Sequence, residues 1–370
     1  MNSRTWKIFI SVCAIAALAH CNTTDKTRRG YLRANAASLS ATMGAPPRPV
    51  IVIAGFGLTR LADPVTGRHV WGTPRAVWQR TFPDDLDLDP NDRLVPVGWV
   101  GSRGPINTGW QLAIGLRKFG GYTADRDVFP FYYDWRKPAR ENAKLLGELV
   151  ERVRGSAPFR RDDNIKVDLV THSAGAIVAL AYAQDSDRVE NLVMVAPVQR
   201  GSLEAFRVFM RPERFIRRTF TPDIVATWPF VFELLPEDGR VFVDEAGQPL
   251  DRDLWDASSW PFDVARHLAS ARAFRNELRA PRAKVTVLAG DCVPTAIKVL
   301  ARRDGTYAFY PSELRENEQH LARILFEPGD GTVPVSSARA NGDALLFCDG
   351  HQGIAADPSV HRAIIRTLRE

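Results

Sequence analysis

The chain of 370 residues is long enough to bury a large core, either as one domain with insertions or as two domains. It is 45% hydrophobic and 25% charged, the balance of a soluble globular protein. Its formal net charge is +6, and the sequence contains no phosphate-binding loop, zinc-spaced cysteines or nucleic-acid motif. We therefore expect no nucleic-acid partner. The charge reflects either arginine usage or a role in attracting the protein to anionic lipid surfaces.

Residues 1–20 are typical of an export signal. Basic residues precede an apolar core and a small-x-small cleavage site, and the segment is too short to span a bilayer comfortably. The alternative is a lipoprotein box in which Cys21 becomes the lipidated first residue, although His20 is larger than the residue usual before that cysteine. In either case we expect an exported protein, periplasmic, secreted or anchored, in which residues 21–48 form a linker.

Residues 49–54 form a short, continuous apolar run of the kind that a buried parallel strand gives. The run ends in Gly55-Phe56-Gly57, and glycines directly after a strand let the backbone approach a ligand closely. In esterases built on such a sheet, one amide of the oxyanion hole comes from this loop. We therefore assign the Phe56 N–H to that role. The alternative is that these residues form only a tight turn.

Strand and helix patterns alternate over the following residues. Apolar residues have helical spacing at 109–119 and 138–153, and strand patterns lie at 128–133, 167–172, 191–197, 284–291 and 344–347. This alternation predicts an α/β fold in which a mostly parallel sheet is covered by helices on both faces.

The strand at 167–172 ends at Ser173, and Gly175 follows two residues later, before a pattern typical of a buried helix. Such an elbow exposes a hydroxyl at the carboxyl end of a sheet, where backbone amides and a helix N-terminus favour negative charge. Ser173 is therefore the candidate nucleophile, and the Ala174 N–H is the second candidate oxyanion donor. The usual motif at such an elbow is Gly-x-Ser-x-Gly, and Thr171 stands here in place of its first glycine. The alternative to a nucleophile is that Ser173 only begins the helix, since serine favours that position.

The alternation lapses between about 202 and 280, in an insertion rich in aromatic residues. An apolar insertion at the carboxyl end of a sheet is typical of a cap that covers an apolar substrate. Most of its aromatic residues must nevertheless pack the insertion against the rest of the domain. Arginines interleaved with its first part would then face anionic lipid head groups. These arginines are Arg207, Arg211, Arg214, Arg217 and Arg218.

Candidates for an acid and a base lie near the end of the chain. Asp330 stands in a Gly-Asp-Gly loop, and His351 follows the last predicted strand. The order Ser173, Asp330, His351 is that of the α/β-hydrolase triad, in which a carboxylate orients a neutral histidine that takes the serine proton. The rivals are His361, inside the last predicted helix, and Asp291, at the end of a strand.

Cys292 and Cys348 each close a predicted strand. In an oxidising compartment we expect them to form a disulfide, and the alternative is two buried free thiols. The residues named so far imply no metal or organic cofactor.

With these residues in place, the chain resembles the lecithin:cholesterol acyltransferase family, which also contains phospholipid:diacylglycerol acyltransferases and lysosomal phospholipases. Five blocks in the same order carry the resemblance: Pro49–Leu61, Tyr132–Arg136, Asp168–Ser173, Phe232–Pro236 and Gly329–Ser336. The resemblance implies an α/β-hydrolase domain over 49–370 with a cap at about 202–280. It also implies Ser173 as nucleophile, Asp330 as acid and His351 as base.

These inferences together predict an acyl-enzyme formed on Ser173 from an ester-linked lipid. If the acceptor is an alcohol, the enzyme is a lipid O-acyltransferase, and if the acceptor is water, it is a lipase or phospholipase. A dry, apolar cap favours transfer because it keeps water from the acyl-enzyme. The alternatives are an esterase of soluble esters and a catalytically inactive lipid-binding protein that retains the fold.

Overall fold

The computed structural model describes residues 46–370, apart from 47, 74–85, 90–91, 102–107, 157–158, 160–161, 211–212, 216–217 and 341. At 213–215 and 218–220 it describes the backbone alone. The predicted export signal at 1–20 and nearly all of the predicted linker at 21–48 lie outside these residues. Within the described ranges, no helix has both the length and the apolar character needed to cross a bilayer.

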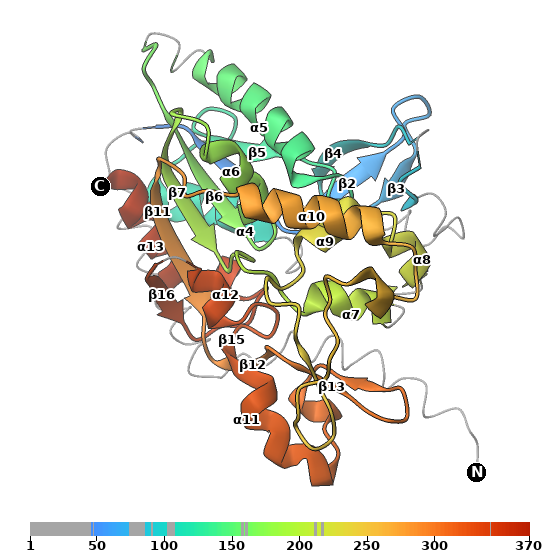
Figure 1. The fold of residues 1–370 in the computed structure, drawn as a ribbon. Coiled ribbons are helices and arrows are strands. Elements are labelled where there is room, and N and C mark those ends of the chain that lie inside the picture. The colour runs from blue at the N-terminus through green and yellow to red at the C-terminus, as the bar shows by residue number, and fades with distance from the viewer. Residues whose placement is uncertain are drawn as a thin grey trace, which may run out of the picture.

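A six-stranded sheet forms the centre of the molecule, in the order β16-β11-β7-β6-β1-β5 (Figure 1). Its strands are β1 (Val50–Ile53), β5 (Val128–Phe131), β6 (Val167–His172), β7 (Val189–Val195), β11 (Lys284–Gly290) and β16 (Ala344–Phe347). Every neighbouring pair runs parallel. Continuous apolar runs such as Val50–Ile53 suit this position because both faces of a parallel sheet are buried.

Helices cover both faces of the sheet, and the alternation of side chains along each strand decides which helices each residue meets. The covering helices are α4 (Thr108–Gly120), α5 (Ala139–Arg154), α6 (Gly175–Ala183) and α13 (Pro358–Arg369). Val50 and Val52 join the apolar cluster that contains α4 and α13. Ile51 and Ile53 face the opposite way, into the cluster that contains α5 and α6. The predicted α/β architecture is confirmed.

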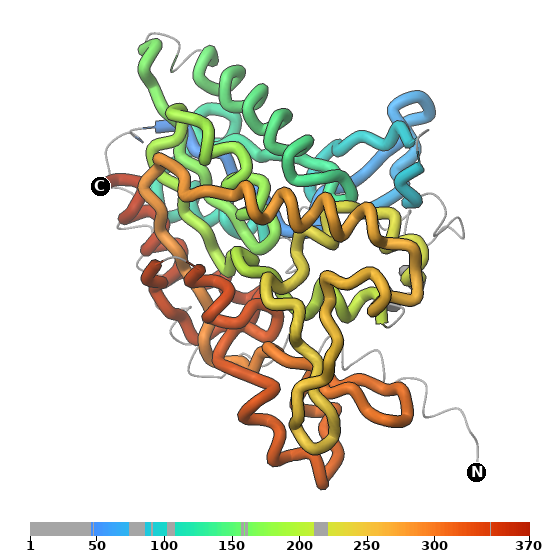
Figure 2. Tube along the Cα trace, viewed as in Figure 1, coloured from blue at the N-terminus to red at the C-terminus, as the bar shows by residue number. Residues whose placement is uncertain are grey.

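Four further small sheets among the described residues were not predicted. An antiparallel sheet of β2 (Thr59–Ala62), β3 (His69–Trp71) and β4 (Val95–Trp99) follows the first strand. Between β11 and α12 (Val335–Arg339) the chain adds β12 (Val293–Ala296), β13 (Val299–Ala301), β14 (Tyr307–Ala308), α11 (Ala322–Leu325) and β15 (Phe326–Gly329). These elements extend away from the central sheet in the chain trace, and part of them is built on a separate apolar cluster (Figure 2).

The segment predicted as a cap, residues 202–280, contains several helices and short strands. They are α7 (Glu204–Met210), β8 (Glu213–Phe215), β9 (Arg218–Phe220), α8 (Pro222–Val225), α9 (Pro229–Glu233), β10 (Phe242–Val243) and α10 (Ala265–Glu277). Helices α7, α8, α9 and α10 lie near one another in Figure 1. The four small sheets of the described residues are β3-β2-β4, β10-β13-β14, β12-β15 and β8-β9. β10 pairs with β13, so the cap segment and the elements after β11 are hydrogen-bonded to each other.

Glu233 fastens this segment to the body of the protein. An oxygen of its buried carboxyl group accepts a 2.8 Å hydrogen bond from the N–H of Ala139, the first residue of α5. The N–H of Phe230 also donates to the carbonyl of Arg136, at 3.4 Å. Burial raises the pKa of the Glu233 carboxyl to about 8 against its ordinary value of 4.5, although the Ala139 N–H and the cation of Arg275 oppose this rise.

We expect Glu233 to make the free energy of unfolding fall as the pH rises. Between about pH 4.5 and 8 the folded chain keeps a proton that the unfolded chain has released, so stability is full below this window and is lost across it. The slope from one proton is at most about 1.4 kcal/mol per pH unit. Urea denaturation at pH 5, 6 and 7 of the wild type and of Glu233→Gln measures it. Parallel pH profiles of the two proteins would contradict the assignment.

Candidate active site

Ser173 lies on a sharp turn between β6 and α6. Its φ angle is +54°, in the left-handed region that side chains other than glycine rarely adopt, and this strain is typical of a nucleophile elbow. The turn is held because the Ser173 N–H donates to the carbonyl of Val195, at 3.0 Å. Gly175 lets α6 pass close to β1, since a Cβ at that position would lie 2.6 Å from the carbonyl oxygen of Ala54.

The structure brings Ser173, His351 and Asp330 into one hydrogen-bonded chain. The Oγ of Ser173 lies 2.8 Å from Nε2 of His351, and Nδ1 of His351 lies 2.7 Å from Oδ2 of Asp330. A carboxylate can only accept, so Nδ1 of a neutral His351 carries the proton and Nε2 is free to accept the proton of the serine hydroxyl. All three side chains are buried.

The carboxylate of Asp330 is oriented by its own loop. Oδ1 accepts hydrogen bonds from the N–H groups of Thr332 and Val333, at 2.9 and 2.7 Å, which leaves Oδ2 for His351. The acid and base loops are also joined by their backbones, because the His351 N–H donates to the carbonyl of Asp330 at 2.9 Å. Gly290, at the end of β11, makes room for the acid: a Cβ there would lie 2.7 Å from the Cβ of Asp330.

Cys292 and Cys348 form a disulfide. The two cysteines follow the neighbouring parallel strands β11 and β16, and their Cα atoms lie 4.9 Å apart. Both residues are exposed, so the alternative of two buried thiols does not describe them. The bond lies three residues before His351 and therefore braces the loop that carries the candidate base.

The two rival residues lie elsewhere. His361 is buried in α13, where its Nε2 contacts the carbonyl oxygen of Ala355 at 2.8 Å and its ring packs against Gly115. An oxygen of the Asp291 carboxylate lies 3.5 Å from the Sγ of Cys292, which has no proton to donate because it is disulfide-bonded. Neither side chain is hydrogen-bonded to Ser173 or His351 in the described part of the chain.

The two candidate oxyanion donors have no hydrogen-bond acceptor among the described residues: neither the Phe56 N–H nor the Ala174 N–H is paired. The loop after β1 comes close to the nucleophile at Gly55, where a Cβ would lie 3.0 Å from the Cβ of Ser173. Unpaired amides beside a serine are the donors that an oxyanion hole requires.

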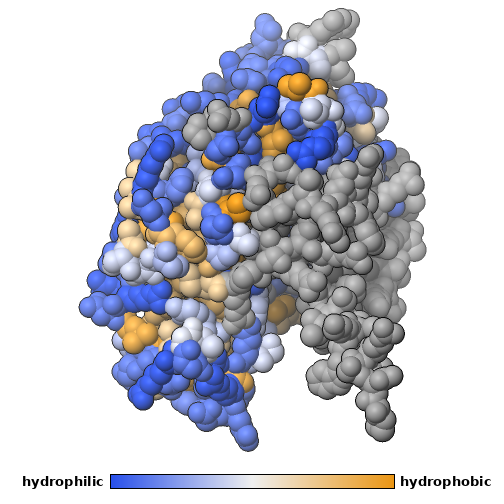
Figure 3. All heavy atoms as spheres, turned by 90° about the vertical axis from the view of Figure 1, so that its right-hand side faces the viewer, coloured by the Kyte–Doolittle hydropathy of each residue, from blue (hydrophilic) through white to orange (hydrophobic). Residues whose placement is uncertain are grey.

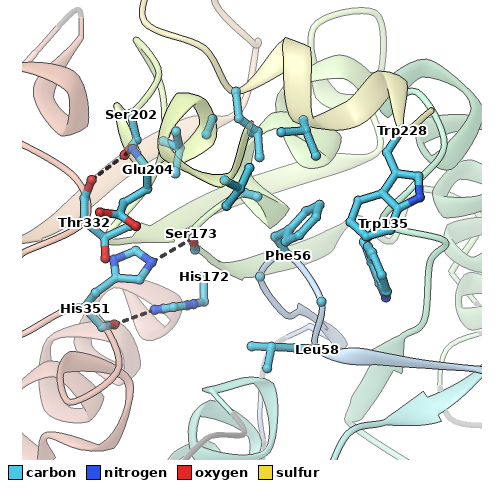
Figure 4. A pocket seen from close by; sticks show the side chains of 18 of the residues that line it. Phe56, Leu58, Trp135, His172, Ser173, Ser202, Glu204, Trp228, Thr332 and His351 are labelled. Carbon is cyan, nitrogen blue, oxygen red and sulfur yellow. Dashed lines mark hydrogen bonds between the residues drawn. The ribbon is translucent and has the colours of Figure 1, made fainter. Parts of the chain in front are cut away.

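A cavity of about 390 Å³ opens beside Ser173 (Figure 4). Apolar side chains from the loop after β1, from the body and from the cap segment make up most of its wall. They include Phe56, Leu58, Trp71, Trp135, Val198, Val208, Val225, Trp228, Val231 and Leu234. In Figure 4 Ser173 lies between His351 on one side and Phe56, Trp135 and Trp228 on the other; we call these last three residues the aromatic wall. Its rings pack against one another, with centroids 5.0 to 6.2 Å apart.

The indole groups of the aromatic wall are held by backbone carbonyls. The Nε1–H of Trp135 donates to Thr59 at 3.0 Å, and that of Trp228 donates to Leu86 at 2.7 Å. Arg136, fully buried, donates to the carboxylates of Asp134 and Asp92 and so ties the segment that follows Leu86 to the end of β5. Residues Asp134, Trp135 and Arg136 thus support the cavity wall.

The end of the cavity next to His351 is polar. Ser202, Glu204, Thr332 and Gln352 line it, and Figure 4 shows the first three beside the candidate base. Glu204 accepts hydrogen bonds from Arg207 and from the Tyr310 hydroxyl, so Arg207 is ion-paired at the cavity.

The other arginines predicted to face lipid cannot be placed in the same way. Arg211 and Arg217 lie outside the described residues, as do the side chains of Arg214 and Arg218. In the coloured part of Figure 3, hydrophilic residues predominate on the surface, and apolar residues form patches among them.

Among known proteins, the Alpha/beta hydrolase family matches residues 112–340, more than half of the chain. No curated protein matches it. One chain of the solved Tle4–Tli4 complex is similar to this chain at 15% identity and a TM-score of 0.58. The alignment covers 88% of this chain and 99% of that chain. Mature Bacillus licheniformis lipase BlEst2 aligns with 88% of this chain and 94% of its own at 14% identity, with a TM-score of 0.41.

Phospholipase PlaB from Legionella pneumophila aligns with 87% of this chain and 60% of its own at 12% identity, with a TM-score of 0.40. At such low identity these likenesses concern the fold alone. The family match and the parallel sheet with helices on both faces agree with the predicted fold class. The chain belongs to the alpha/beta hydrolase family, and its fold is the α/β-hydrolase fold.

Proposed function

We propose that this protein is a serine-dependent enzyme that removes the acyl group from ester-linked lipids through an acyl-enzyme on Ser173. One observation carries the proposal. The hydroxyl of Ser173 lies 2.8 Å from the accepting Nε2 of His351, at the wall of a largely apolar cavity. Family membership supports the reaction class, and the lining of the cavity supports a lipid substrate.

In the first half of the reaction, the Oγ of Ser173 attacks the ester carbonyl carbon while its proton passes to Nε2 of His351. Asp330 keeps the proton on Nδ1 and stabilises the imidazolium ion that forms. The carbonyl oxygen becomes an oxyanion that the Phe56 and Ala174 amides stabilise. The C–O bond then breaks, and the leaving alcohol takes the proton from Nε2.

In the second half, an acceptor hydroxyl gives its proton to Nε2 of His351 and attacks the acyl carbon, the bond from this carbon to Oγ breaks, and Oγ takes the proton from Nε2, which regenerates Ser173. Water as the acceptor makes the enzyme a lipase or phospholipase. An alcohol as the acceptor makes it a lipid O-acyltransferase, as the resemblance to the lecithin:cholesterol acyltransferase family implies. The apolar wall beside Ser173 supports this second candidate, because it suits the hydrocarbon part of a lipid alcohol.

The same proposal includes a location outside the cytoplasm. The exposed Cys292–Cys348 disulfide supports it, since such bonds persist in oxidising compartments. Cleavage of residues 1–20, or lipidation of Cys21, would deliver the protein there.

The test is to incubate the mature protein with vesicles of acyl-labelled phospholipid, with and without a long-chain alcohol or a sterol, and to separate free fatty acid from new ester. Ser173→Ala serves as the matched control. We expect serine-dependent product. New ester identifies a transferase, and free acid alone identifies a lipase.

Two outcomes would overturn the proposal. Equal activity on short soluble esters and on vesicles would identify an esterase of soluble substrates. No serine-dependent product from any ester would leave a lipid-binding protein that retains the fold.

A further inference from the structure

A second histidine, His172, lies at the candidate site. It is the last residue of β6, directly before Ser173, and its side chain is fully buried. Its Nε2 lies 2.8 Å from the main-chain carbonyl oxygen of His351, and the centroids of the two imidazole rings are 4.8 Å apart (Figure 4). The neighbour of the candidate nucleophile therefore contacts the backbone of the candidate base.

The protonation state of His172 follows from this contact. A carbonyl oxygen only accepts, so Nε2 of His172 carries the proton and donates it. Burial, together with the nearby His351, lowers the pKa of His172 to about 3, so the ring is neutral where a serine enzyme works. Its Nδ1 is buried, close to Gly55, and has no hydrogen-bond partner within the described ranges. Among the described residues, the only hydrogen bond of this ring is therefore the one from Nε2.

The contact joins two distant parts of the sheet. Strands β7 and β11 lie between β6, which carries Ser173, and β16, which leads to His351. The backbone of His351 is anchored at both ends, because its N–H donates to Asp330 while its carbonyl accepts from His172. Asp330 therefore ties the base to the acid, and His172 ties the base to the strand of the nucleophile.

We propose that His172 is a positioning residue that sets the distance between Ser173 and His351 by holding the main-chain carbonyl of His351. The proposal rests on the function proposed above for Ser173. A displacement of about 1 Å in a catalytic arrangement can cost on the order of 100-fold in rate. His172 makes no contact that would require it to exchange a proton with the substrate, and it acts through His351.

The sharpest test compares His172→Gln with His172→Met. Both variants lose the ring, and both side chains are as long as the path from Cα to Nε2 of histidine. Only glutamine keeps an N–H at that reach. We expect His172→Met to lower kcat by about 10- to 100-fold with KM changed by less than about threefold, and His172→Gln to recover most of the loss.

Each rate is divided by the concentration of protein that a fluorophosphonate titrates at Ser173, and thermal unfolding is recorded alongside. A purely structural role would lower the unfolding temperature and leave kcat per titrated site unchanged. That result, or a His172→Gln variant no faster than His172→Met, would overturn the proposal.

A measurement on the unmodified protein covers the case in which neither variant folds. Nitrogen-15 NMR of the histidine rings reports the tautomer, and we expect His172 to be neutral with its proton on Nε2 from pH 5 to 8. A proton on Nδ1, or a charged ring, would overturn the proposal. If the wild type is no more active than Ser173→Ala on any ester, the proposed function fails, while this NMR result still decides the contact.

Discussion

Replacing Ser173 with alanine is expected to lower kcat on the preferred ester by about 10⁴- to 10⁶-fold. The hydroxyl is the only group on the elbow that is hydrogen-bonded to Nε2 of His351, at 2.8 Å, and alanine removes it without adding bulk. The fold should persist, because serine and alanine have the same steric cost at a φ angle of +54°. Initial rates on acyl-labelled lipid vesicles at saturating substrate measure the effect.

Ser156→Ala is the matched control for this substitution. Ser156 lies past the end of α5, where its hydroxyl donates to the carbonyl of Val153 and lines no part of the cavity. We expect its kcat to equal that of the wild type. A Ser173→Ala enzyme that keeps a tenth of the wild-type kcat would show that Ser173 is not the nucleophile.

Replacing Asp330 with asparagine is expected to lower kcat by roughly 10³- to 10⁴-fold with little change in KM. The N–H groups of Thr332 and Val333 require an acceptor at the Oδ1 position, so the asparagine oxygen should take that place. Its NH₂ group then faces Nδ1 of His351 and donates to it. The imidazole proton moves to Nε2, which can no longer accept the proton of Ser173.

The rival carboxylate supplies the control for this second experiment. Asp291→Asn changes the same group at the end of β11, where the structure shows no hydrogen bond to His351 among the described residues. Rates on the same lipid ester, measured from pH 6 to 9, compare the two variants. If Asp291→Asn loses activity as strongly as Asp330→Asn, the acid has been assigned to the wrong residue.

Several features of the site could be predicted because they depend on short stretches of sequence. The strand and helix patterns gave the parallel sheet and both helical layers, since apolar spacing reflects which faces are buried. The serine at 173 and the glycine at 175 predicted a turn between a strand and a helix, and the structure contains this turn between β6 and α6. Chain order singled out Asp330 and His351, and the structure brings both to Ser173.

His172 shows why the rest could not be predicted. Its only sequence signal is its place before Ser173, whereas its hydrogen bond is to a residue 179 positions away. The indole of Trp228 is likewise held by the carbonyl of Leu86, 142 positions earlier in the chain. Such contacts depend on how loops from separate strands converge, and no local pattern encodes that convergence.

By itself, the sequence determined the α/β class, the elbow that carries Ser173 and the order of the candidate acid and base, because each follows from local periodicity or spacing. The tertiary structure alone decided that His172 contacts the backbone of His351, how the aromatic wall is supported, and that Glu233 joins the cap segment to α5. The physical reason is that burial and hydrogen-bond partners belong to the packed chain, and distant residues supply them.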